Sequence, residues 1–146
     1  MAETSCYACG SAVAGEANNC AHCGQPLLLR ERYRIKRILG QGGFGIVYEA
    51  FESTLRRRYA IKVINTVNPA VREQVEIEGQ ILAQHARRLP FMPEIYDIWS
   101  DTGRTVLVME YIDGVTLGAI IERYGPWPPA IAAQFLRTML ANLAML

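Results

Sequence analysis

Short segments rich in β-branched and aromatic residues recur through the middle of this 146-residue chain, separated by polar turns. Such residues favour strands over helices. The last two segments flank "DTG", a typical hairpin turn. The pattern predicts five strands, at residues 33–39, 45–52, 58–65, 94–100 and 104–111.

Helical patterns interrupt and follow these strands. Asn68 and Pro69 start one that continues through residue 88, between the third and fourth strands. Two more follow the last strand, at residues 114–125 and 130–146, with the prolines of "PWPP" between them. Proline suits the first turn of a helix because its missing N–H would have no partner there. The order of elements predicts an α+β fold.

Composition and charge narrow the class of protein. Hydrophobic residues make up 51% of the chain, enough for a sizeable core, and the net charge is +1. So small a charge offers no field that would attract nucleic acid or an acidic membrane. The longest apolar runs are too short to span a bilayer, and "MAETSCYACG" at the start is no secretory signal. We therefore expect a cytoplasmic protein with no membrane segment.

All four cysteines lie in the first 24 residues, as two C-x-x-C pairs, each followed by glycine. Four thiolates in this pattern are typical of tetrahedral Zn²⁺ ligation, and a reducing compartment disfavours disulfides. A disulfide pair or a redox motif is the alternative. His22 lies between two of the cysteines and could compete as a ligand, but four thiolates already complete the set, so we interpret His22 as a spectator. The segment resembles the short zinc ribbons of many bacterial proteins. We expect a zinc-ribbon unit at residues 1–24 and a linker at residues 25–32, with structural zinc on Cys6, Cys9, Cys20 and Cys23.

The stretch "LGQGGFGIVYEA" concentrates four of the chain's 12 glycines. Gly40, Gly42 and Gly45 fit the spacing G-x-G-x-x-G, which two unrelated nucleotide sites share. In a dinucleotide-binding fingerprint a helix begins at the glycines, whereas here Ile46 and the residues after it favour a strand. The glycines are therefore expected to join two strands as a hairpin.

From Tyr33 onward the chain resembles the N-terminal part of a bacterial-type serine/threonine protein kinase. The motifs that carry the resemblance are the glycine loop, "YAIK", a helix with acidic residues, and "VLVMEYIDGVTL". The resemblance implies a kinase small lobe, with a five-stranded antiparallel sheet and one helix, followed by the first large-lobe helices. We therefore expect a kinase domain at residues 33–146, truncated before its catalytic loop, with the zinc ribbon in front of it.

The resemblance also implies an ATP site. Lys62 would hold the α- and β-phosphates, and Glu78 would pair with Lys62, with Glu76 as the runner-up. Met109 would lie behind the adenine, whose edge would bond the Glu110 carbonyl and the Ile112 amide. The remaining expected contacts come from the glycine loop, from Val47 and Ala60 around the ring, and from Leu117 at the pocket floor; the loop residues are Leu39, Gly40, Gln41, Gly42, Gly43, Phe44 and Gly45.

The family's later motifs, H-R-D-x-x-x-x-N, D-F-G and A-P-E, do not occur in this sequence. The catalytic aspartate and the Mg²⁺ ligands are therefore missing from it. Phosphoryl transfer from ATP with Mg²⁺ to a protein substrate is expected only of the complete enzyme.

Other functions stay open. One is a non-catalytic zinc-ribbon and nucleotide-binding module that regulates or binds another protein, and another is a pseudokinase-like scaffold. Residues 1–24 contain two glutamates and no lysine or arginine, and four thiolates on one dication add further negative charge. Nucleic acid needs basic residues to meet its phosphates. We therefore expect a protein partner at the ribbon rather than a nucleic acid.

These missing motifs generate a first prediction. We expect the 146-residue chain to transfer no phosphate, because a small lobe supplies neither the catalytic base nor the metal ligands. The measurement is incorporation of radiolabelled phosphate from ATP into a generic protein substrate, with Lys62→Met as the control. Transfer above that control would contradict the prediction.

Overall fold

The computed structural model describes residues 4–14, 17–43, 45–65, 68–86, 91–101 and 103–145. Their strands and helices run in the order β1 (Thr4–Ser5), β2 (Ala12–Val13), β3 (Leu28–Leu29), β4 (Tyr33–Gly42), β5 (Gly45–Glu52), β6 (Arg57–Asn65), α1 (Pro69–Ala86), β7 (Ile95–Asp101), β8 (Arg104–Glu110), α2 (Leu117–Tyr124) and α3 (Pro129–Leu143).

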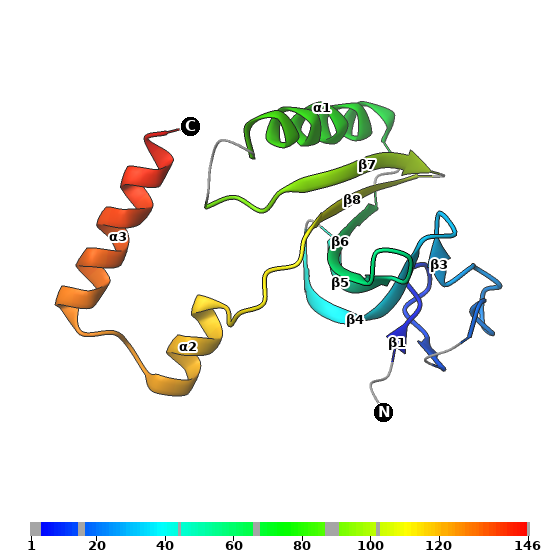
Figure 1. The fold of residues 1–146 in the computed structure, drawn as a ribbon, viewed down its shortest axis with the longest axis horizontal. Coiled ribbons are helices and arrows are strands. Elements are labelled where there is room, and N and C mark those ends of the chain that lie inside the picture. The colour runs from blue at the N-terminus through cyan, green and yellow to red at the C-terminus, as the bar shows by residue number, and fades with distance from the viewer. Residues whose placement is uncertain are drawn as a thin grey trace.

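One antiparallel sheet forms the body of the molecule, in the order β3-β4-β5-β6-β8-β7 (Figure 1). It has six strands rather than the expected five, because Leu28 and Leu29 of the expected linker pair with β4. A tight turn makes this pairing possible: Arg30 and Glu31 both adopt positive φ, and the Arg32 amide donates to the Leu29 carbonyl. The five strands of the sequence pattern all form.

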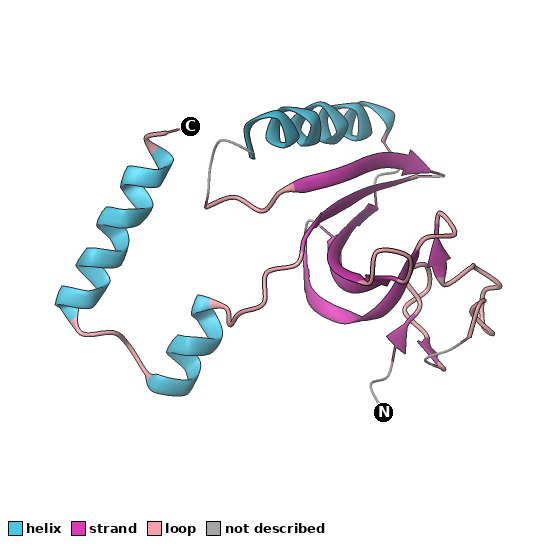
Figure 2. Cartoon of the chain, in the orientation of Figure 1, coloured by secondary structure: helices cyan, strands magenta, loops and turns pink. Residues whose placement is uncertain are grey.

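The sheet curls strongly, and the core lies inside the curl (Figure 2). Tyr33, Tyr59 and Tyr96, from β4, β6 and β7, meet edge to face with ring centroids 5.3 and 5.4 Å apart. This geometry suits aromatic quadrupoles and stabilises the packing beyond simple area burial. Aliphatic side chains on the same face complete the core; these are Leu29, Ile35, Ala50, Ile61, Val63, Val106 and Val108.

Helix α1 lies along β7 and β8, on the other side of the sheet from the core (Figure 1). The Asn68 side chain accepts a hydrogen bond from the Ala70 amide, which caps the helix start. The helix comes close to β7 at Gly79, where an added Cβ would lie 2.3 Å from the Cδ1 atom of Ile98. A side chain at this position would require the end of the Ile98 side chain to shift.

The cysteine-rich unit packs against the same sheet rather than standing apart from it. Arg34 of β4 donates to the Ala17 carbonyl at 3.1 Å and to the Asn18 side chain at 3.2 Å. Tyr7 packs against the main core. Arg30, just after β3, reaches β7: its guanidinium lies 3.3 Å from the Asp97 carboxylate and stacks on Trp99. Arg30 thus bridges the two edge strands of the curled sheet.

Helices α2 and α3 extend away from the sheet (Figure 1). Thr116 caps α2 by accepting from the Ala119 amide, and Gly125 ends it at positive φ. Neither helix has a buried residue within the described part of the chain. Large apolar side chains of α3 are exposed instead, among them Ile131, Leu136, Met139, Leu140 and Leu143. In the ranges described, no helix combines the length and the apolar character that crossing a membrane requires.

The exposed stripe on α3 generates a second prediction. Leu140 is 64% exposed, and each large apolar side chain left in water forgoes about 1.5–3 kcal/mol of burial energy. We therefore expect residues 128–146 to be poorly ordered in solution or to mediate self-association, whereas residues 33–112 stay folded. Hydrogen exchange on a monomeric sample measures this. Protection over residues 130–146 equal to that of the central strands would contradict it.

Candidate functional site

The glycine stretch forms the hairpin between β4 and β5. β4 is longer than predicted, since it continues to Gly42, which pairs with Gly45, whereas β5 begins at Gly45 as predicted. Gly45 has φ +116°, and an added Cβ would collide with the Val63 carbonyl. Gly40, Gly42 and Gly43, by contrast, have open space where a Cβ would project. The fold therefore requires glycine at 45 but leaves the absence of side chains at the other three unexplained. Phe44 lies outside the described residues.

The register of β5, β6 and β8 places the expected nucleotide residues in two adjacent rows. Lys62 pairs with Val47 on one side and with Leu107 on the other. The next row contains Glu49, Ala60 and Met109. Alternation along β6 directs the neighbouring Ile61 into the core, so Ala60 and Lys62 share the opposite face. The structure thus brings Val47, Ala60, Lys62 and Met109 together on one surface.

A cavity of about 320 Å³ lies between the hairpin tip, β6, β8 and α1. Lys62 and Glu78 both line it, together with Gly43 at the hairpin. Apolar side chains of α1 and the sheet form most of the rest; they are Ile64, Val71, Val75, Leu82 and Leu107. The Glu78 carboxylate accepts a hydrogen bond from the Gln74 side chain at 2.9 Å. Glu73 and Glu76, the other acidic candidates on α1, are not among the residues that line the cavity.

The expected adenine-binding segment follows β8. The Glu110 amide donates to the Glu94 carbonyl at 2.8 Å, and the Glu110 carboxylate accepts from the Glu94 amide at 3.3 Å. Ile112 lies beyond the strand and is 63% exposed. Leu117, expected at the pocket floor, is the first residue of α2 and lies outside the cavity lining. Val47, Ala60 and Met109 also lie outside this lining, so the cavity does not test the expected purine contacts.

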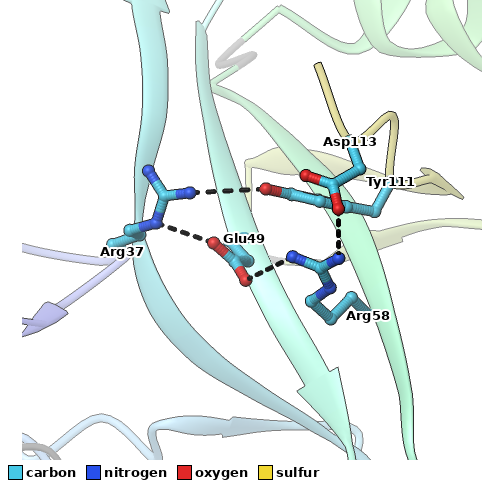
Figure 3. Close-up of polar contacts among 5 residues, drawn as sticks. All are labelled: Arg37, Glu49, Arg58, Tyr111 and Asp113. Atoms are coloured by element: carbon cyan, nitrogen blue, oxygen red, sulfur yellow. Dashed lines mark hydrogen bonds and ion pairs between the residues drawn. The ribbon is translucent and has the colours of Figure 1, made fainter. Parts of the chain in front are cut away.

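A group of polar side chains around this segment escaped the sequence interpretation (Figure 3). The sequence pattern predicted a strand from residue 58, and β6 begins one residue earlier, at Arg57. Arg57 stacks on Tyr96 and donates to its hydroxyl, and Arg58 binds Asp113 at 2.8 Å. No local sequence pattern predicts these contacts, because the contacting residues are distant from one another in the sequence.

The four cysteine sulfurs form a compact cluster, with all ligand atoms within 4.8 Å of one another. Cys6 and Cys23 are 3.7 Å apart at sulfur, and so are Cys9 and Cys20. Tetrahedral zinc with Zn–S bonds of about 2.3 Å requires sulfurs about 3.8 Å apart, so the cluster fits this ion. All four are free thiols, which excludes the disulfide alternative in this structure, and His22 is not part of the group.

Two matching turns present these sulfurs. The Gly10 amide donates to the Cys6 carbonyl and the Gly24 amide to the Cys20 carbonyl, each at 2.8 Å. Both glycines adopt positive φ, near 75°, which a residue with a side chain rarely does. Hydrogen bonds with Ser11 lower the pKa of the Cys9 thiol to about 6, whereas burial raises the pKa of Cys6. The C-x-x-C-G sequence thus folds twice into the same turn, and each turn contributes two sulfurs to the cluster.

Comparison with known proteins identifies the family of the chain from Tyr33 onward. The protein kinase domain family matches residues 33–146. Serine/threonine-protein kinase PknD of Mycobacterium tuberculosis is 35% identical over 116 residues, which cover 76% of this chain and 17% of that protein. PknE of the same species is 34% identical over 110 residues, covering 72% and 19%. In structure, the chain is similar to the twitchin kinase region from C. elegans, with a TM-score of 0.53 and 27% identity over 59% of this chain and 15% of that one.

The chain therefore belongs to the protein kinase family, and its bacterial relatives are serine/threonine kinases. It spans less than a fifth of the length of PknD and PknE. The resemblance noted in the sequence is thus confirmed at the level of family and fold.

Proposed function

We propose that this chain is the ATP-binding portion of a serine/threonine protein kinase. The observation that carries the proposal is that Lys62, Glu78 and the hairpin residue Gly43 line one cavity. Phosphoryl transfer depends mainly on positioning and on charge neutralisation of the phosphates. A lysine and a carboxylate that face the same space beside a glycine hairpin supply both.

The roles follow from the chemistry of each group. The Lys62 ammonium neutralises phosphate oxygens, and the Glu78 carboxylate orients that ammonium from α1. Amides of the hairpin donate to phosphate oxygens, and the open space beside Gly40 and Gly42 lets a ligand approach the backbone closely. Such an approach explains why these positions lack side chains although the fold does not require it.

The purine end of the nucleotide is assigned to the row of Ala60 and Met109 and to the segment after β8. Ala60 leaves room for a flat ring, and Val47 covers it from the hairpin side. The Glu110 carbonyl accepts from the purine edge and the Ile112 amide donates to it. Mg²⁺, when bound with ATP, neutralises charge on the phosphates, and the sequence described here lacks the ligands for it.

We further propose that Cys6, Cys9, Cys20 and Cys23 hold one structural zinc ion. The sulfur spacing supports this, as does the small core of the unit, in which the buried residues are Cys6, Cys20 and Leu27. So small a core does not fold by itself, and metal binding supplies about 10 kcal/mol or more to such units. The ion would hold Tyr7 against the sheet, and the acidic unit would offer its outer surface to a protein partner.

Nucleotide binding is the test of the first proposal. We expect ADP to bind the 146-residue chain. Gly40→Ala and Gly42→Ala should each weaken ADP binding by about 1 kcal/mol, roughly fivefold, for each amide contact that is lost. Their thermal stability should stay near that of the wild type because the sites are open. Gly45→Ala is the contrasting variant and should lower stability by about 1–3 kcal/mol.

Isothermal titration calorimetry measures the ADP affinity of each variant, and a thermal melting curve measures its stability. Together they separate a loss of ligand contacts from a loss of folding. Equal ADP affinity in the wild type and Lys62→Met would refute the assigned site. No binding by the wild type, with zinc still bound, would favour the alternative of a non-catalytic protein-interaction module.

Metal content tests the second proposal. We expect about one zinc per chain in protein purified without added metal, and its loss in Cys20→Ser, because structural sites use all four thiolates. The matched control is His22→Ala, which lies between two ligands but outside the cluster and should keep its zinc. Elemental analysis with a thiol-reactivity assay measures both. Substoichiometric zinc together with four freely reactive thiols would rule the site out.

A further inference from the structure

Residues 111–116 connect the sheet to α2 and belong to no helix or strand. This segment contains Ile112, whose amide is the expected purine donor. A donor on an irregular segment binds well only if the segment is held in place before the ligand arrives. The question is therefore what holds residues 111–113 against the sheet.

Side chains on both sides of Ile112 attach the segment (Figure 3). The Asp113 carboxylate accepts from the Arg58 guanidinium at 2.8 Å, and the Tyr111 hydroxyl accepts from Arg37 at 3.3 Å. Arg58 also stacks on the Tyr111 ring, 4.4 Å from its centroid. Arg58 therefore contacts both residues that flank Ile112.

One carboxylate links the two arginines. Glu49 of β5 binds Arg37 at 2.7 Å, and its other oxygen lies 4.0 Å from Arg58. Only 13% of the Glu49 side chain is exposed, and its strand position pairs with Ala60. Glu49 thus anchors both arginines in the row that the purine is proposed to occupy. Three adjacent strands, β4, β5 and β6, converge on the segment through this network.

The two arginines suit this task. The planar guanidinium presents several donors in a fixed arrangement and stacks on aromatic rings, so one side chain can bind a carboxylate and cover a tyrosine at once. A lysine offers a single point of charge and no stacking plane. The Asp113 hydrogen bond raises the pKa of Arg58 further, so the guanidinium stays charged.

We propose that Arg58, together with Glu49 and Arg37, is a positioning residue that fixes Tyr111 and Asp113 and so presents the Ile112 amide to the purine of a nucleotide. This inference rests on the proposed function for its ligand. The order of residues 111–113 in the ligand-free chain does not depend on a nucleotide. It can therefore be measured separately from nucleotide binding.

The experiment compares Arg58→Gln with Arg56→Gln. Both remove one positive charge from the same three-arginine run, but Arg56 lies in the turn before β6 and Arg58 holds Asp113. NMR order parameters of the 111–113 amides in the ligand-free chain should fall in Arg58→Gln and not in Arg56→Gln, because they report the mobility of the backbone directly. Raising the salt concentration should have a similar effect on the wild type, because exposed ion pairs are screened.

Ligand binding by the same variants completes the test. Arg58→Gln should weaken ADP by about two- to fivefold, the range expected for partly exposed ion pairs, and leave pyrophosphate binding unchanged. Lys62→Met should weaken both ligands. Combining Arg58→Gln with Asp113→Asn should weaken ADP binding no further than Arg58→Gln alone, because the contact with Asp113 is already lost in that variant. Arg58→Lys should restore only part of the affinity.

Two outcomes would overturn the inference. One is unchanged order parameters of the 111–113 amides in Arg58→Gln. The other is equal ADP affinity for Arg58→Gln and Arg56→Gln while the wild type binds ADP. Failure of the wild type to bind any ADP refutes the proposed function instead, and the order parameters still decide whether Arg58 orders the segment.

Discussion

The antiparallel register of β6 between β5 and β8 is the constraint on which the rest of the structure depends. It places Ile61 and Val63 in the core and Ala60 and Lys62 on the opposite face. A slip of one residue would exchange these faces, burying a lysine and exposing the core. Because burying the apolar set is strongly favoured, the position of Lys62 beside the cavity follows from core packing and needs no separate stabilisation.

The second requirement is the close packing of α1 on β7. Gly79 allows the helix to approach Ile98, and Glu78 is the adjacent residue on the same helix. The distance of the helix from the sheet therefore sets how far the Glu78 carboxylate lies from β6. A side chain at residue 79 would displace the Cδ1 methyl group at the end of the Ile98 side chain. Gly79 itself lines the cavity beside Glu78, so the close packing of the helix on β7 lies directly at the site.

The cysteine-rich unit and the kinase sheet are physically continuous in this protein. β3 extends the sheet, Tyr7 packs on its core, and Arg30 joins β3 to Asp97 and Trp99 of β7. Neighbouring residues of β7 alternate between faces, so Trp99 meets Arg30 while Ile98 meets α1. α1 therefore packs on one face of β7, and Arg30, from the segment that follows the cysteines, contacts the opposite face of the same strand.

The sequence by itself determined the features that depend on local pattern. Alternation and β-branched residues located all five main strands, glycine spacing located the hairpin, and the C-x-x-C-G repeats located the sulfur cluster, because each signal is complete within a short stretch. Only the tertiary structure decided the sixth strand, the exposure of Leu117 on α2, and the contacts of Arg58. Leu28 and Leu29 pair as a strand because β4 offers an edge, and Arg58 meets Asp113 55 residues away because β6 pairs with β8. Such contacts depend on where distant segments meet, which no local pattern encodes.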